Sequence, residues 1–128
     1  MKHCLIIDDD QDDQEIFILC IAKLSADIVC KTANDGVEAL DLLTNSGYVP
    51  DLIFLDVNMP KMNGIDCLKR IRAIDSMAGT YICMYSTTSE VKVVNEAMAI
   101  GADRFVVKPA RVSELTGVLA GIFNIANN

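Results

Sequence analysis

Reactive side chains follow four apolar runs of this sequence. Asp8 and Asp9 follow the first run, Asp56 ends the most apolar one, Ser86 follows another, and Lys108 follows the last. If these runs are parallel strands of one sheet, the five side chains meet at its carboxyl edge. Three acids, a hydroxyl and a lysine in one pocket are suited to placing a phosphoryl group on a carboxylate.

The apolar runs alternate with segments of helical periodicity, which predicts the elements that position these residues. We expect strands at residues 3–8, 27–33, 51–56, 80–85 and 104–107. We expect helices at 12–24, after the Asn34-Asp35-Gly36 turn, at 63–74, from an N-cap at Ser89 to Ile100, and after a cap at Ser113. Five βα units predict an α/β fold, with a parallel sheet covered by helices on both faces.

The same periodicity assigns the core-facing side of each helix. Residues 27–33 are the most polar of the runs, so we expect an edge strand there. The apolar faces are predicted to comprise Phe17, Cys20, Ile21 and Leu24; Val37, Leu40 and Leu43; Ile65, Leu68 and Ile71; and Leu115, Val118, Leu119, Ile122 and Phe123.

Size and charge restrict the function. The 128 residues predict one domain and no separate effector domain. A net charge of −7 argues against direct binding of nucleic acid, and no run is long enough to span a bilayer. We therefore expect a cytoplasmic protein that does not insert into membranes. Its five scattered cysteines are expected to be reduced thiols.

Four segments together resemble the receiver domain of bacterial two-component response regulators, and the likeness covers nearly the whole chain. They are Ile6-Ile7-Asp8-Asp9; Leu55-Asp56-Val57-Asn58-Met59-Pro60 with Met62-Asn63-Gly64; Ser86; and Gly101-Ala102-Asp103 with Phe105-Val106-Val107-Lys108-Pro109. The resemblance implies a flavodoxin-like, doubly wound (βα)5 fold, whose five-stranded parallel sheet has the order 2-1-3-4-5.

The resemblance also implies a phosphoacceptor and a metal site. Asp56 would be the nucleophile that accepts the phosphoryl group. Asp9, Asp56 and the backbone carbonyl of Asn58 would bind Mg²⁺ or Mn²⁺, and Asp8 would act through a water or from the second shell. Hard oxygen ligands of this kind suit Mg²⁺. The acids at 10, 12 and 13 have an ordinary explanation, the helix macrodipole, and no metal role is assigned to them.

Three further roles follow from the resemblance. Lys108 would pair with the phosphoryl oxygens, aimed by a cis Lys108–Pro109 bond. Ser86 would donate its hydroxyl to the phosphoryl group, and Phe105 would rotate inward in response, although a plain core aromatic is the simpler reading of Phe105. The position after Ser86 is usually very small in the family, so Thr87 is expected to narrow access to Asp56.

The implied partners are a sensor histidine kinase or a histidine phosphotransfer protein, and an unknown protein downstream. The signal would leave through the helix after Ser89, strand 104–107 and the last helix, near Val91, Asn95, Phe105 and Leu115. This surface would bind that partner or a second copy of the protein, as a homodimer formed on phosphorylation.

Three alternatives remain at this level. A phosphatase of the haloacid dehalogenase type also uses a strand-end aspartate, but its second aspartate is replaced here by Asn58, which cannot transfer a proton. A degenerate receiver would only bind proteins. A flavodoxin-like cofactor protein would need a first loop that accepts an anionic phosphate, whereas Asp8-Asp9-Asp10 would repel one.

Overall fold

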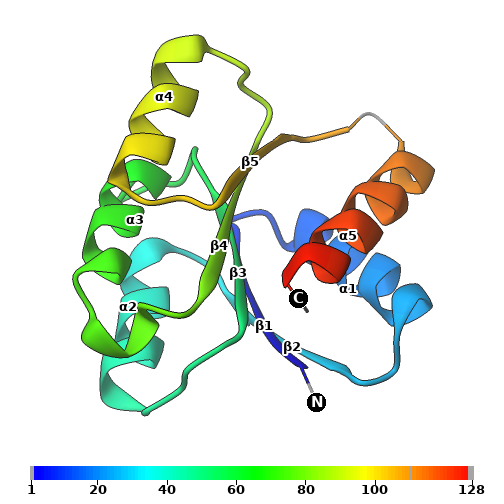
Figure 1. Cartoon of the computed structure of the whole chain (residues 1–128), viewed down its shortest axis with the longest axis horizontal. Helices are drawn as coiled ribbons and strands as arrows, with labels where there is room; N and C mark the ends of the chain where they lie inside the picture. Colours follow the sequence, from blue (N-terminus) through cyan, green and yellow to red (C-terminus); the bar gives the residue numbers. More distant parts are fainter. Residues whose placement is uncertain (1, 110, 127–128) are drawn as a thin grey trace.

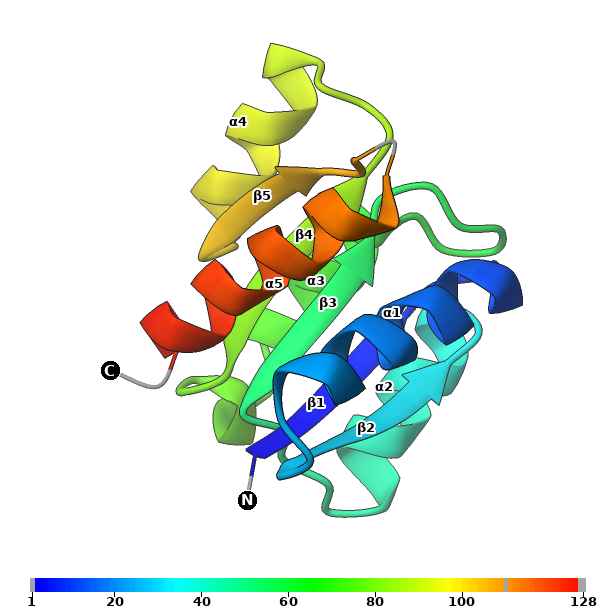
Figure 2. The same cartoon turned by 90° about the vertical axis from the view of Figure 1, so that its right-hand side faces the viewer.

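The fold is built on one parallel sheet, seen in a computed structural model that describes residues 2–109 and 111–126. Its strands lie in the order β2-β1-β3-β4-β5 (Figure 2). Their bounds are Lys2–Ile7 (β1), Ile28–Ala33 (β2), Leu52–Asp56 (β3), Tyr81–Ser86 (β4) and Arg104–Val107 (β5). The predicted fold class and strand order are confirmed, with residues 28–33 at an edge.

Helices cover both faces of the sheet (Figure 1). They are α1 (Gln11–Leu24), α2 (Gly36–Asn45), α3 (Gly64–Arg72), α4 (Val91–Ile100) and α5 (Val112–Ala126), with a short 3-10 turn, η1, at Asp75–Met77. α2, α3 and α4 lie on one face, and α1 and α5 on the other. Within the described residues, no helix is long and apolar enough to cross a membrane.

Strand alternation divides the core into two clusters, because successive side chains of a strand point to opposite faces. Leu5 and Ile7 pack on the α2–α3–α4 side, whereas Cys4 and Ile6 pack on the α1–α5 side. All of β3 is buried, as expected for a central parallel strand covered on both faces. The predicted apolar stripe of α5 is confirmed on the second side.

Asx capping starts three of the helices where the sequence has a suitable side chain. The Asp10 carboxylate accepts from Asp12 N–H at the start of α1, Asp35 caps α2, and Asn63 caps α3. The expected cap at Ser89 is wrong. Helix α4 begins after Glu90, whose backbone N–H is instead bound by the Thr88 hydroxyl, so Ser89 is not needed.

Two other local predictions are corrected. Ser113 lies inside the first turn of α5, which begins at Val112, so it is not the cap. Val37 is exposed, and Gly36, Ala39 and Leu43 form the buried side of α2. The core face of α2 is therefore centred on these three residues and is rotated away from Val37.

Arg72 joins several elements at the amino edge of the sheet. Its guanidinium donates to the carbonyls of Gly101, Met77 and Thr80 and to Asp103 Oδ2, at 2.8–3.0 Å. Asp103 Oδ2 also accepts from the Ile82 N–H at the start of β4. Arg72 is also the last residue of α3, which therefore ends two residues before the predicted end.

Gly64 is required by a close approach of the loop after β3. Its N–H donates to the Val57 carbonyl at 2.7 Å. A Cβ at this position would overlap the Asp56 carbonyl oxygen and come within 2.7 Å of Val57 Cα. Both neighbours are backbone atoms, so they cannot move aside as a side chain can. By contrast, a Cβ at Gly117 on α5 would meet nothing within 4 Å.

These two glycines give a matched stability test. Gly64→Ala should lower the free energy of unfolding by about 2–3 kcal/mol, because the loop must move away from Asp56. Gly117→Ala should raise it by about 1 kcal/mol, because alanine favours the helix and has open space. Chemical denaturation measures both. Equal effects of the two substitutions would contradict the close approach at Gly64.

Candidate functional site

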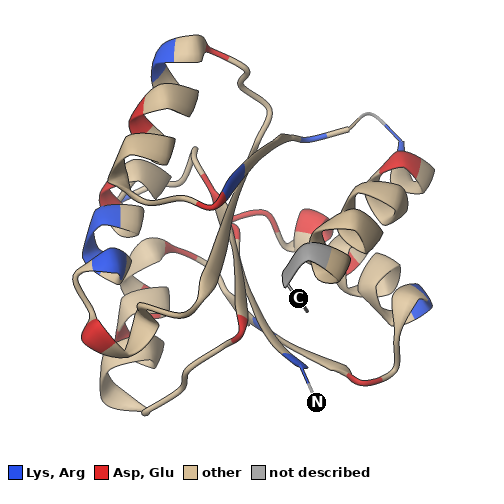
Figure 3. Cartoon of the chain, viewed as in Figure 1, with Lys and Arg blue, Asp and Glu red and all other residues tan. Residues whose placement is uncertain are grey.

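The first acidic residues lie where β1 ends. Asp8 is buried, and its Oδ1 accepts from the Asp10 backbone N–H at 3.0 Å, while Asp9 beside it is exposed. Buried Gln14 reaches back from α1 and donates to the Asp8 carbonyl at 2.6 Å and to Asn34 Oδ1 at 3.1 Å. The loop between β1 and α1 is therefore held by hydrogen bonds on both sides. Acidic residues run through this loop into the start of α1 (Figure 3).

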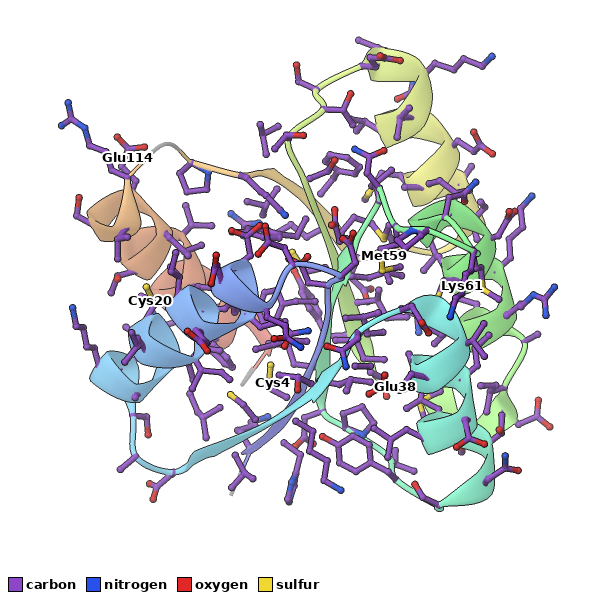
Figure 4. The ribbon with its side chains drawn as sticks, turned by 180° about the vertical axis from the view of Figure 1, so that it is seen from behind. Cys4, Cys20, Glu38, Met59, Lys61 and Glu114 are labelled. Atoms are coloured by element: carbon purple, nitrogen blue, oxygen red, sulfur yellow. The ribbon has the colours of Figure 1, made fainter. Side chains whose placement is uncertain are left out.

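Asp56 is the last residue of β3 and is only 6 % exposed. Its Oδ1 accepts from the Asn58 backbone N–H at 3.3 Å. The loop that follows carries Met59, which is buried, and Lys61, which lies 3.6 Å from Asp35 at the start of α2 (Figure 4). The Gly64 contact closes this loop against Asp56.

Asp8, Asp9 and Asp56 come together as predicted. One carboxylate oxygen from each lies within 4.8 Å of the others. Carboxylates this close repel one another unless a cation or a proton offsets their charge. Since the available donors are all hard oxygen atoms, the chemistry of the cluster fits Mg²⁺ or Mn²⁺.

Lys108, just after β5, reaches into this cluster. Its Nζ lies 3.0 Å from Asp13, 3.3 Å from Asp8 and 3.7 Å from Asp56. The ammonium also lies 4.8 Å from the centre of the Tyr85 ring. One lysine thus contacts three carboxylates, so their negative charge is only partly offset.

Burial shifts the proton affinities of these groups. Desolvation raises the pKa of Asp56 to about 6, against the lowering effect of Lys108. Desolvation also raises the pKa of Asp8, against hydrogen bonding from Asp10 and the charge of Lys108. Burial alone would lower the pKa of Lys108, but the hydrogen bond to Asp13 and the charges of Asp56 and Asp8 hold that pKa above its usual range. Lys108 is therefore charged, and Asp56 is largely ionised near neutral pH.

Ser86 and Phe105 lie on the same side of the sheet. Ser86 ends β4, is fully buried, and accepts from the Thr88 N–H through its hydroxyl at 3.2 Å. Phe105 is half-buried and packs on the α2–α3–α4 side. The register pairs Met84 with Phe105 and Ser86 with Val107, so Ser86 and Phe105 are diagonal neighbours on that side. Thr87 is exposed, and its effect on access to Asp56 stays a prediction.

Sequence reasoning missed Asp13 and Gln14. A signal was available, because the α1 stripe that begins at Phe17 places these two residues on the sheet-facing side when it is extended back by one turn. Helix-dipole arguments explain why an acid is tolerated at residue 13, but not that it binds Lys108.

The expected cis bond before Pro109 is not found. Every peptide bond between described residues is trans, including Lys108–Pro109. The trans form is the more stable by about 0.5–1 kcal/mol for a bond before proline. With it, Lys108 already contacts its three carboxylates.

This fold and site define a receiver. Residues 4–120 match the family model described as the response regulator receiver domain, and the chain belongs to that family. Two-component signalling is therefore the setting in which the acidic cluster, Ser86 and Lys108 are to be understood.

Known proteins similar to this chain differ in length. The chemotaxis protein CheY of Thermotoga maritima is 33 % identical over 118 residues, which cover 92 % of this chain and 94 % of that protein. A protein-glutamate methylesterase/protein-glutamine glutaminase of Methanospirillum hungatei is also 33 % identical, over 90 % of this chain, but the match spans only 33 % of that protein. The chain thus spans about a third of this longer relative.

A solved structure of a chemotaxis protein is also similar to this chain. The chain is similar to CheY in the CheX–CheY–beryllofluoride–Mg²⁺ complex from Borrelia burgdorferi, with a TM-score of 0.81 and 29 % identity. The match covers 95 % of this chain and 89 % of the other. That neighbour was seen with Mg²⁺, with beryllofluoride and with a protein partner.

The raised pKa of Asp56 predicts a pH-dependent gain in stability from Asp56→Asn when divalent cations are absent. The folded pKa, about 6, lies above the ordinary value of 3.8, so ionising Asp56 opposes folding. This cost is absent below about pH 4, grows between about pH 4 and pH 6, and is complete above that. Asp56→Asn should therefore gain about 2–3 kcal/mol at pH 7.5 and little at pH 4. Urea titrations across this range measure it, and a pH-independent difference would contradict the desolvation of Asp56.

Proposed function

We propose that this chain accepts a phosphoryl group on Asp56, in a Mg²⁺-dependent reaction, from the phosphohistidine of a sensor histidine kinase or a histidine phosphotransfer protein. The observation that carries the proposal is the approach of Asp8, Asp9 and Asp56 to within 4.8 Å, with Lys108 3.7 Å from Asp56. Family membership supports the same reaction. The chain acts as a cytoplasmic signalling receiver, whose catalysis is limited to its own phosphorylation and dephosphorylation.

Asp56 is the nucleophile. A carboxylate oxygen attacks phosphorus, the phosphorus–nitrogen bond to the donor histidine breaks, and the imidazole leaves with its electron pair and gains a proton. The burial of Asp56 suits this role, because a desolvated carboxylate is more reactive and the acyl phosphate is shielded from water.

Asp9, Asp56 and the Asn58 carbonyl would hold the metal ion, and Asp8 would act on it through a water or from the second shell. Mg²⁺ or Mn²⁺, when bound, offsets the charge that develops on the transferred phosphoryl oxygens. Asp8 is anchored by the Asp10 N–H and by Lys108, so its orientation is fixed before the ion arrives.

Lys108 and Ser86 complete the site. Lys108 pairs with one phosphoryl oxygen, and the Ser86 hydroxyl donates to another. The hydroxyl now accepts from the Thr88 N–H, which leaves its own proton free to donate, and its movement toward the phosphoryl group lengthens the bond from Thr88. Its movement vacates space on the side of the sheet shared with Phe105, and Phe105 turns inward to fill it. The surface of α4, β5 and α5 then binds a downstream protein or a second copy of the chain.

Phosphorylation tests the central assignment. Incubation with acetyl phosphate and Mg²⁺ should add one phosphoryl group, seen by intact-mass spectrometry. Asp56→Asn should abolish the addition, because the acceptor oxygen is lost. A chelator should also prevent phosphorylation, and Asp9→Ala should weaken Mg²⁺ binding although the acceptor Asp56 is still present.

Equal labelling of the wild type and Asp56→Asn would reject Asp56 as the acceptor. Failure of the wild type to label would favour a binding module without phosphotransfer.

The switch is tested separately with Ser86→Ala. This variant should still bind the phosphate mimic beryllofluoride, but it should transmit the change poorly, because the Ser86 hydroxyl no longer moves. NMR shifts of residues 91–119 report the distant response. If Ser86→Ala gives the same distant shifts as the wild type, Ser86 is not the coupling residue.

A further inference from the structure

The shortest ion pair of Lys108 is made with a residue outside the phosphoryl site. Asp13 Oδ2 lies 3.0 Å from Nζ, closer than the carboxylate of Asp8 or of Asp56. Asp8 and Asp56 lie at strand ends, whereas Asp13 belongs to the first turn of α1. The resting ammonium group therefore lies closer to α1 than to Asp56, the expected phosphoryl acceptor.

We propose that Asp13 is a positioning residue that fixes the resting position of Lys108 and competes with the phosphoryl oxygens for its ammonium group. This inference rests on the function proposed above, in which Lys108 binds the phosphoryl group. It adds a residue from α1 that sets how readily the site accepts an anion.

Burial decides which of the three contacts Lys108 can give up. The side chains of Asp8 and Asp56 are 3 % and 7 % exposed, whereas that of Asp13 is 35 % exposed. If Lys108 leaves Asp13, water can solvate the freed carboxylate at little cost. Loss of a partner by a buried carboxylate would cost much more. The Asp13 contact is thus the one to be exchanged for a phosphoryl oxygen.

The ammonium group borders open space on its Asp13 side and is already close to Asp56. A cavity of about 200 Å³ lies between α1 and the start of α5, and Asp13, Tyr85 and Lys108 line it. The Tyr85 ring lies against the ammonium group. The backbone N–H of Lys108 donates to the Ser86 carbonyl and so holds the backbone of Lys108 in place. Because Nζ is already 3.7 Å from Asp56, a phosphoryl oxygen on Asp56 would come within its reach after a small movement of the side chain, while the backbone stays in place.

The exchange also changes a link between distant elements. Lys108 lies between β5 and α5, so its pair with Asp13 joins this segment to α1. When the phosphoryl group takes the ammonium, that link is released. Occupation of the site is then felt at the α1–α5 side as well as through Ser86 and Phe105.

Beryllofluoride affinity in Mg²⁺ tests the competition. Asp13→Asn should bind beryllofluoride roughly three- to tenfold more tightly than the wild type, because Lys108 no longer has to leave a charged partner. Asp12→Asn is the matched control, since Asp12 is exposed on the same turn and its removal changes the net charge equally. Asp13→Glu should restore affinity close to that of the wild type by retaining a carboxylate for Lys108.

A second background separates competition from a simple field effect. In a Lys108→Ala background, Asp13→Asn should change the affinity for beryllofluoride no more than Asp12→Asn does, because the ammonium group for which Asp13 competes is absent. A gain from Asp13→Asn that persists without Lys108 would overturn the proposal, as would equal gains from Asp12→Asn and Asp13→Asn in the wild-type background. Two results would reject the proposed function and, with it, this inference. One is that the wild type does not bind beryllofluoride; the other is that Asp56→Asn binds it with the same affinity as the wild type.

Discussion

The structure depends on the burial of negative charge at one edge of an apolar sheet. Asp8 and Asp56 are nearly fully buried, and Asp9 lies beside them. Lys108 contacts the two buried acids, but it shares its charge with Asp13. In a medium less polar than water, such an imbalance favours any cation that can enter. A divalent ion would offset the buried charge and leave the site able to accept the further negative charge of a phosphoryl group, so an arrangement that costs stability suits the proposed switch.

Strand alternation places the two buried acids and the proposed switch residues on opposite sides of the sheet. Asp8, Asp56 and Lys108 continue the pattern of Ile6, Phe54 and Val106, whose side chains pack on the α1–α5 side. Ser86 continues the pattern of Met84, on the side that also holds Phe105. A phosphoryl group at the strand ends can therefore draw on both sides at once. In the proposed switch, Lys108 would transmit the change to α1 and Ser86 would transmit it to the side of the sheet that α4 covers, so two surfaces would respond to one covalent change.

The sequence was most informative where a single physical pattern decided the outcome. Apolar runs and helical stripes predicted the sheet and the five helices, and the residues after the runs predicted the cluster of Asp8, Asp9 and Asp56. Local competition was harder to foresee. The cap expected at Ser89 was displaced by the Thr88 hydroxyl, and Val37 lost its core place to the smaller Ala39. The partner of Lys108 on α1 depends on how a helix is rotated against a sheet, and the apolar periodicity of α1 indicates this only when it is extended one turn before its first residue, Phe17.

The two edges of the sheet have different tasks. At the amino edge, Arg72 donates to three carbonyls and Asp103, and so ties α3, η1, β4 and the turn before β5 together. At the carboxyl edge, the contacts are made by loops and strand ends, and the two that the proposed switch would exchange are those of Ser86 with Thr88 and of Lys108 with Asp13. Between them lie the buried strands, which link the edges rigidly. A stable amino edge allows the carboxyl edge to keep buried, incompletely paired charge without loss of the fold, and to rearrange its hydrogen bonds when that charge is changed.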